Sequence, residues 1–236
     1  MVSEKRKKEL EEFLKKNNVK MEKYELLNSS LTHPSFMFER DIKKNQHNQR
    51  LEFLGDAVLG LVIAEYLYNH FPGKKEGILT KMRAAIVCEG SLAESARKIN
   101  LGSYILMGKG EKMGGGENRT SNLADAWEAL CGAIYLENGI GGVKDFILDS
   151  LKEVIDNVVQ GNFGDYKTRL QELIQKCPEQ EIEYQIIEEN GPDHDKDFLA
   201  GVNINGKNIS QGKGKTKKEA EQVAAKEALI IMGDIG

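Results

Sequence analysis

Two acidic residues interrupt the most apolar part of this sequence. Glu52 and Asp56 are four residues apart, and a helix would place them on the face that continues through Leu59 and Ile63. A solvated helix face does not normally continue into core residues. Because burying a carboxylate is costly unless it is paired or holds a metal, this helix needs a cationic partner.

A second acidic pair, Asp125 and Glu128, lies three residues apart in another apolar stretch. Ala129 and Gly132 follow on the same side, and such small residues let another helix approach closely. We therefore expect the two acidic faces to meet. Four carboxylates at close range repel one another unless cations neutralise them, and an oxygen-only ligand set suits Mg²⁺ or Mn²⁺. The pattern predicts a divalent-metal site.

The motifs around these acids resemble the ribonuclease III family. Residues 51–56 (LEFLGD) are similar to the family signature, and the second acidic stretch also matches. Residues 31–35 (LTHPS) and the segment from Glu76 to Ala84 match further motifs in the family's order. The resemblance covers nearly everything up to about residue 155, and it implies an all-α endonuclease domain.

This resemblance also implies a reaction. The family hydrolyses phosphodiester bonds of double-stranded RNA and leaves 5′-phosphate and 3′-hydroxyl ends with short 3′ overhangs, as in the processing of ribosomal RNA precursors, messenger RNAs and other structured transcripts. The cofactor would be Mg²⁺, for which Mn²⁺ can substitute. The implied metal ligands are Glu52, Asp56, Asp125 and Glu128. Asp56 and Glu128 are the implied catalytic residues.

Three further positions follow from the resemblance. Glu76 matches an accessory acidic position of the RNA-cleaving valley. Phe53 matches an aromatic residue that inserts into a partner subunit, which implies a homodimer with two active sites, each cutting one strand. Gln49 departs from the pattern, because the family commonly has Glu there. Gln49 lies near Glu52 and Asp56 on the helical wheel but carries no charge, so we expect it to line the edge of the site without binding metal.

The composition is that of a soluble protein with one large or two ordinary domains. The chain has 236 residues, of which 40% are hydrophobic, and a formal net charge of −4. No apolar run reaches the roughly 18 residues of a membrane span, and the first fourteen residues form a charged helix pattern rather than a signal peptide. We expect a cytoplasmic protein with no membrane partner.

Helical periodicity dominates the first 159 residues. Ser91 and Glu94 predict a capping box at the start of one helix. Residues 36–47 read as a polar loop, and the glycine-rich segment 108–119 reads as a mobile connector because it lacks the end of a P-loop. His33 is interpreted as a structural residue at a helix end. The expected helices cover residues 5–17, 24–32, 49–70, 76–87, 92–99, 121–136 and 145–159.

The helical pattern stops at residues 160–164, where two glycines enter within five residues. We expect a nuclease domain over residues 1–159, a linker over 160–164 and a second domain over 165–236. Asn205-Gly206 predicts a hairpin turn in the second domain. The expected elements there are a helix at 166–177, strands at 181–188, 198–204 and 207–212, and a helix at 216–232. The fold class is multidomain, with an all-α domain followed by a small α-β-β-β-α domain.

This α-β-β-β-α order, with the segments 191–194 (GPDH) and 212–221 (GKGKTKKEAE), resembles the double-stranded RNA-binding domain. Lysines at a helix N-terminus add to the helix dipole and to exposed N–H groups, which favours phosphate binding. The alternative is a solvated helix start, which explains the charge but not the glycines or the domain order. The resemblance implies minor-groove contacts by Gln171, Glu172 and His194, and phosphate contacts by Lys215, Lys217 and Lys218.

The net charge of the chain, and that of its C-terminal part, gives no support to a nucleic-acid partner. From Gly164 onward, ten basic residues stand against fourteen acidic ones, so any phosphate-binding patch is local. Two alternative functions would explain parts of the sequence. A catalytically silent dimeric RNA-binding module would not need four intact carboxylates, and a metal phosphohydrolase for small nucleotides would not need the C-terminal domain. Incubating a long RNA duplex with and without Mg²⁺ would discriminate among them.

Overall fold

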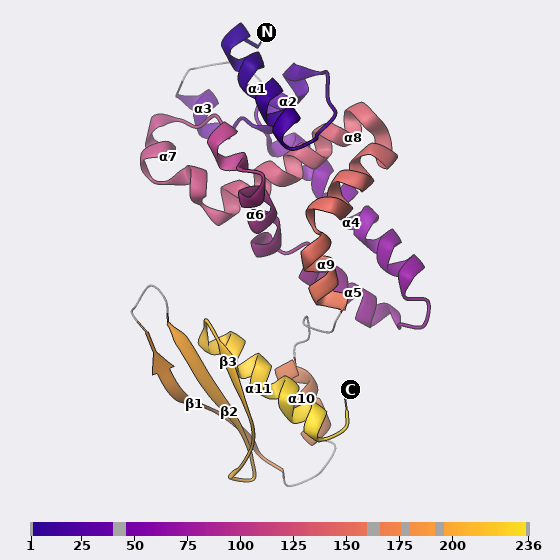
Figure 1. The fold of residues 1–236 in the computed structure, drawn as a ribbon, viewed down its shortest axis with the longest axis vertical. Coiled ribbons are helices and arrows are strands. Elements are labelled where there is room, and N and C mark those ends of the chain that lie inside the picture. Colours follow the sequence, from indigo (N-terminus) through magenta and orange to yellow (C-terminus); the bar gives the residue numbers. More distant parts are fainter. Residues whose placement is uncertain (1, 40–45, 160–165, 176–179, 192–195, 235–236) are drawn as a thin grey trace. The chain divides into compact units, whose positions relative to one another are not determined.

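The protein is described by a computed structural model, which covers residues 2–39, 46–159, 166–175, 180–191 and 196–234 (Figure 1). The chain forms two compact units, Met1–Asn162 and Phe163–Gly236. The expected linker at 160–164 lies outside the described residues. None of the described helices is both long and apolar enough to cross a membrane.

The described part of the first unit is helical, apart from an isolated bridge between Thr32 and Leu106. Its α-helices are α1 (Glu4–Lys16), α2 (Tyr24–Ser30), α3 (Pro34–Phe38), α4 (Gln49–His70), α5 (Glu76–Ile86), α6 (Glu89–Lys98), α7 (Lys109–Met113), α8 (Thr120–Ser150) and α9 (Lys152–Val159). Short 3₁₀ turns cover Leu101–Tyr104 and Gly116–Asn118.

The long helices α4 and α8 form the centre of this unit. Both carry apolar residues around most of their circumference, which is typical of helices surrounded by other helices. Leu59 and Ile63 of α4 and Trp127 and Leu130 of α8 are fully buried. Helices α2, α5 and α6 pack against this pair. Helix α8 turns at Gly139, which has a φ of 69°.

Two glycines set the distance between α4 and α8. A Cβ atom at Gly55 would overlap the carbonyl oxygen of Glu128, and one at Gly132 would overlap the carbonyl oxygen of Leu51. The two backbones are therefore in direct contact at this crossing. Gly132 therefore has the role predicted for the small residues of α8, while the matching glycine on α4, Gly55, lies between the two acids of the signature.

Several sequence predictions in this unit were wrong in detail. Helix α6 begins at Glu89, with Cys88 at the N-cap position, and Ser91 donates a hydrogen bond to the carbonyl of Ala85 instead of capping the helix. The segment 108–119 contains α7 and a 3₁₀ turn because Glu39 accepts hydrogen bonds from the first backbone N–H groups of α7. Part of the expected loop at 36–47 belongs to α3.

The last expected helix of the first unit also differs from the structure. Residues 145–159 were expected to form one helix, but α8 continues to Ser150 and α9 starts at Lys152. Leu151, at the junction, is fully buried, and its backbone N–H bonds to the carbonyls of Asp149 and Ile147. The apolar periodicity continues across this junction, so the break left no signal in the hydrophobic pattern.

The second unit has the predicted element order. Helix α10 (Tyr166–Gln175) is followed by β1 (Ile182–Asn190), β2 (Asp197–Ile204), β3 (Lys207–Gly214) and α11 (Lys217–Ile231). The strands form an antiparallel sheet in the order β1-β2-β3, and both helices cover one face of it (Figure 1). Asn205 and Gly206 both have positive φ, as a tight hairpin turn requires, so this turn is confirmed. The core includes Leu170, Val202 and Ala228.

We predict opposite effects of alanine at two helical glycines of the first unit. Gly55→Ala should lower the free energy of unfolding by about 1–3 kcal/mol, because the new Cβ meets the backbone of α8. Gly90→Ala, in the first turn of α6, should raise it by about 0.4–1 kcal/mol, because the site is open and alanine restricts the unfolded chain. Urea unfolding followed by the fluorescence of Trp127, the single tryptophan, measures both. Equal stability of the two variants would contradict the tight crossing.

Candidate active site

The crossing of α4 and α8 brings the four predicted carboxylates together. Glu52 and Asp56 flank Gly55 on α4, and Asp125 and Glu128 lie in the facing turns of α8. Glu52, Asp125 and Glu128 are half-buried and Asp56 is exposed. The arrangement matches the expectation that two acidic helix faces meet.

The electrostatics of the four acids show that they lie within range of one another. Burial raises the pKa of Glu128 to about 7, and the charges of Asp56, Glu52 and Asp125 contribute further. Burial likewise raises the pKa of Glu52, with contributions from Asp125 and Asp56. No Lys or Arg in the described part of the chain forms an ion pair with these acids. Within the residues that the structure describes, their charge is therefore not compensated by a lysine or arginine.

Asp125 has two further titratable neighbours, Glu89 and His33, whose closeness to it the sequence did not indicate. Burial raises its pKa, the charge of Glu89 raises it further, and His33 opposes both. Glu89 is in the first turn of α6, 36 positions before Asp125 in the sequence, and only the packing of α6 against α8 makes it a neighbour. Sequence spacing carries no signal for such a contact.

A small polar network fixes the start of α8 just before Asp125. The Glu111 carboxylate accepts hydrogen bonds from Arg119 (2.5 Å) and from the buried Asn122 (2.7 Å), and Asn122 also donates to the carbonyl of Gly116 (3.0 Å). Because Asn122 is one helical turn before Asp125, this network determines where the first acid of α8 lies. Glu111 has no distinguishing signal in the sequence, because it stands in a segment interpreted as a connector.

His33 has the structural role that its position before Pro34 suggested. It is the N-cap of α3, and its Nδ1 accepts a hydrogen bond from the backbone N–H of Ser35 (3.2 Å). Ser35 Oγ lies 2.7 Å from the same Nδ1 and accepts from the N–H of Gly108 (3.0 Å). Burial lowers the pKa of His33 despite the opposing charges of Glu111 and Asp125. A neutral ring with its proton on Nε2 fits these contacts.

The other predicted positions of the first unit do not join the carboxylates. Glu76 is exposed in the first turn of α5, where it accepts a hydrogen bond from Thr80 (2.8 Å). The charges that raise the pKa values of Glu52, Asp125 and Glu128 do not include Glu76. Gln49 is the first residue of α4 and is exposed. Phe53 is 80% exposed on the outer face of α4.

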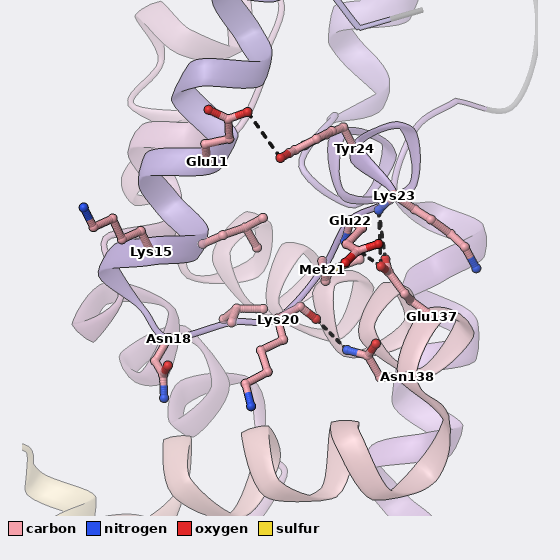
Figure 2. A pocket seen from close by; sticks show the side chains of 12 residues that line it. Glu11, Lys15, Asn18, Lys20, Met21, Glu22, Lys23, Tyr24, Glu137 and Asn138 are labelled. Carbon is pink, nitrogen blue, oxygen red and sulfur yellow. Dashed lines mark hydrogen bonds between the residues drawn. The ribbon is translucent and has the colours of Figure 1, made fainter.

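A hollow of about 850 Å³ lies away from the carboxylates, between α1, α2 and the end of the first part of α8 (Figure 2). Glu137 accepts hydrogen bonds from the backbone N–H groups of Glu22 and Lys23, and Asn138 donates to the carbonyl of Lys20. Figure 2 shows these two side chains turned toward that segment. Their polar atoms bond to the backbone of residues 20–23. We therefore place the chemistry at the α4–α8 crossing.

Most of the predicted RNA-binding residues of the second unit lie on its helices or directly before one. Gln171 and Glu172 are exposed on α10. Lys217 and Lys218 are the first two residues of α11, and Lys215 directly precedes its N-cap. The prediction for His194 lies outside the described residues.

The start of α11 is capped as its sequence suggested. Thr216 accepts a hydrogen bond from the N–H of Glu219 (3.1 Å), and the Glu219 carboxylate accepts from the N–H of Lys215 (2.8 Å). The neighbouring glycines have a packing reason, because a Cβ at Gly212 or Gly214 would collide with the backbone of α11. They are therefore no independent sign of phosphate binding.

Comparisons with known proteins agree with both units. The model of the family "Ribonuclease-III-like" matches residues 23–155, and the model of the "Double-stranded RNA binding motif" matches residues 166–232. The chain is 43% identical to the nuclease domain of ribonuclease III from Campylobacter jejuni, a solved structure that superimposes with a TM-score of 0.57. That match covers 61% of this chain and 96% of the other.

Whole-chain relatives carry one name. The chain is 52% identical over 217 residues to Ribonuclease 3 of Syntrophomonas wolfei, which covers 92% of each sequence. It is 53% identical over 209 residues to Ribonuclease 3 of Caldanaerobacter subterraneus, covering 88% of this chain and 91% of the relative. The chain therefore belongs to the ribonuclease III family, and it is a double-stranded RNA endoribonuclease with a C-terminal double-stranded RNA-binding motif.

Proposed function

We propose that Glu52, Asp56, Asp125 and Glu128 bind the divalent cations of this nuclease, with Mg²⁺ as the cofactor and Mn²⁺ as a substitute. The observation that carries the proposal is the uncompensated negative charge at the α4–α8 crossing, where burial and three other acids raise the pKa of Glu128 to about 7. Carboxylate oxygens are the donors that these cations prefer.

The side chains must change their arrangement to share a cation. Among the described residues, no three His, Cys, Asp or Glu side chains are arranged to hold a metal ion. The donor set still fits, because mutual repulsion keeps uncompensated carboxylates apart and a cation reverses that repulsion. The contacts of Gly55 and Gly132 hold the two backbone segments that carry these acids against each other.

Bound divalent cations would activate the attacking water and stabilise the charge on the leaving 3′ oxygen. Asp56 and Glu128 are the residues that we assign to catalysis, and Glu52 and Asp125 complete the cation site. Asn122 and Glu111 keep the first turn of α8 in place. The products we infer are 5′-phosphate and 3′-hydroxyl ends with short 3′ overhangs, in structured transcripts that include ribosomal RNA precursors.

Two further positions receive lesser roles in this proposal. Glu76 is an accessory acid that faces the substrate valley, in keeping with its exposure at the start of α5. Gln49 borders the site without binding a cation, in keeping with its exposed place at the first residue of α4. Neither position adds to the charge that acts on Glu128.

We propose that the nuclease unit works as a homodimer through the outer face of α4. Phe53, Leu61 and Tyr68 are 80%, 60% and 74% exposed and share one side of this helix. An exposed apolar stripe of this kind is typical of a protein–protein interface. The nuclease domain of the Campylobacter jejuni relative has a structurally flexible region that is involved in dimer formation.

We propose residues 1–159 as the nuclease domain and 165–236 as the RNA-binding domain, joined by the linker 160–164. In the second domain, Lys215, Lys217 and Lys218 contact phosphates, while Gln171, Glu172 and His194 reach minor grooves. Such domains read the shape of an A-form duplex with little base specificity. The exposed lysines at the N-terminus of α11 support the phosphate contacts.

Glu128→Gln tests the metal site. The substitution keeps the shape and removes the charge, so we expect single-turnover cleavage of a long RNA duplex to fall by about a thousandfold or more, equivalent to about 4 kcal/mol of lost cation stabilisation. Duplex binding should not change. The control is Glu65→Gln, which removes an exposed carboxylate of α4 that pairs with Lys144. Near-normal cutting by Glu128→Gln at saturating Mg²⁺ would refute the assignment.

The raised pKa of Glu128 makes the metal-free protein less stable as pH rises. Between about 4.5 and about 7 the folded chain holds a proton on Glu128 that the unfolded chain has released, so raising the pH favours unfolding. Above this window the slope should level off. Urea unfolding in EDTA, followed by the fluorescence of Trp127, measures the effect.

Two additions make the pH measurement specific. Glu128→Gln should flatten the pH dependence in that window, while Glu65→Gln should keep the wild-type slope. Added Mg²⁺ should stabilise the protein more at pH 8 than at pH 5.5, because the cation competes with the proton. A wild-type protein that gains stability with pH in EDTA would contradict the burial of this charge.

Phe53→Asp tests the dimer. A charge in the centre of an apolar interface cannot be solvated, so we expect the variant to sediment as a monomer at concentrations where the wild type is a dimer. Ile231→Asp is the matched control, because Ile231 is also exposed, at 64%, but lies on α11. A dimeric Phe53→Asp protein would place the interface elsewhere.

A further inference from the structure

The lysines at the start of α11 face two acids from the sheet. Lys217 Nζ lies 3.6 Å from one carboxylate oxygen of Glu189, and the other oxygen of that carboxylate lies 2.7 Å from Lys196 Nζ. Lys215 Nζ lies 3.0 Å from a carboxylate oxygen of Asp197. Two of the three lysines that we assign to phosphate binding are therefore paired within the protein.

The strand register explains how these acids reach the helix. Glu189 is next to the end of β1 and opposite Phe198, the second residue of β2. Lys217 Nζ also lies 5.7 Å from the centre of the Phe198 ring. Gly214 keeps the start of α11 against β3, and β3 pairs with β2 at Phe198. The ring and the carboxylate thus hold the same ammonium group.

This ion pair is open to water and can exchange. The side chains of Lys217 and Glu189 are 60% and 38% exposed. The hydrogen bond from Lys196 and the charge of Lys217 lower the pKa of Glu189, so the carboxylate remains ionised at neutral pH. An RNA phosphate that approaches Lys217 therefore meets an anion already in place.

We propose that Glu189 is an internal counter-anion that competes with RNA phosphate for Lys217 and so limits the affinity of duplex binding. The proposal rests on the proposed function of Lys217 as a phosphate contact. A phosphate oxygen must displace the Glu189 carboxylate or share the ammonium group with it. Asp197 competes in the same way for Lys215. Within the described part of the chain Lys218 has no ion pair, so it meets a phosphate without such an exchange.

The competition has a distinct dependence on salt. Salt weakens RNA binding because the release of counterions from the duplex gains less free energy when the salt concentration is high, and salt also screens the pair between Glu189 and Lys217. The internal competitor therefore weakens as salt increases, which makes the fall in affinity shallower. Removing the carboxylate should raise affinity most at low salt and make the log–log slope steeper.

The experiment measures binding of a fluorescent RNA duplex of about 16 base pairs, the length one such domain spans, by anisotropy over a salt series. The full chain is used in EDTA, so that cleavage does not interfere. We expect Glu189→Gln to bind about two- to fivefold more tightly at low salt, the range of an exposed ion pair. The gain should decline as salt increases.

Glu188→Gln is the matched control. It removes the same charge from the neighbouring residue of β1, whose carboxylate contacts Asn190 rather than a lysine. A general loss of negative charge affects both variants, whereas the exchange affects only Glu189. Equal affinities of the two variants over the whole salt series would overturn the proposal.

Lys217→Ala separates this proposal from the one on which it rests. If Lys217 contacts a phosphate, this variant binds less tightly and its log–log slope is shallower by roughly one. An unchanged affinity and slope would refute the phosphate contact itself. In the Lys217→Ala background, Glu189→Gln should lose most of its gain. A gain that persists there in full would show that Glu189 acts on the duplex by another route and would overturn the competition.

Discussion

The close crossing of α4 and α8 is the constraint on which the nuclease unit depends. Gly55 and Gly132 let the two backbones touch, and this contact brings two acidic turns face to face. The same contact that stabilises the core therefore concentrates negative charge, and the cost appears as the raised pKa values of Glu128 and Glu52. A site that accepts this cost, with no basic partner among the described residues, is suited to cations from solution.

Much of this crossing could be predicted from sequence, because helical periodicity is local information. The faces of Glu52 with Asp56 and of Asp125 with Glu128 follow from residue spacing alone. The role of Gly55 did not follow, since a glycine inside a helix looks only like a loss of helix propensity until its neighbour is known. The hairpin at Asn205 was predictable for the same reason as the faces, since turn chemistry is decided by adjacent residues.

What the sequence could not provide were contacts between distant segments. Glu39 accepts hydrogen bonds from the first N–H groups of α7, about seventy positions later in the sequence, where the sequence predicted only a connector. Glu89 became a neighbour of Asp125 through helix packing. The glycines before α11 were interpreted as support for phosphate binding, yet they serve the close approach of β3 to the helix. In each case the structure depends on a contact with a segment that is distant in the sequence.

The charged residues of the two units differ in whether the protein provides them with a partner of opposite charge. At the crossing of α4 and α8 the carboxylates have no basic partner in the described chain, so binding a cation removes a repulsion. At the start of α11 the lysines already have acidic partners, so binding a phosphate would exchange one anion for another. An overall charge of −4 repels RNA weakly at long range. Duplex recognition must therefore come from short-range contacts, where internal acids such as Glu189 can limit it.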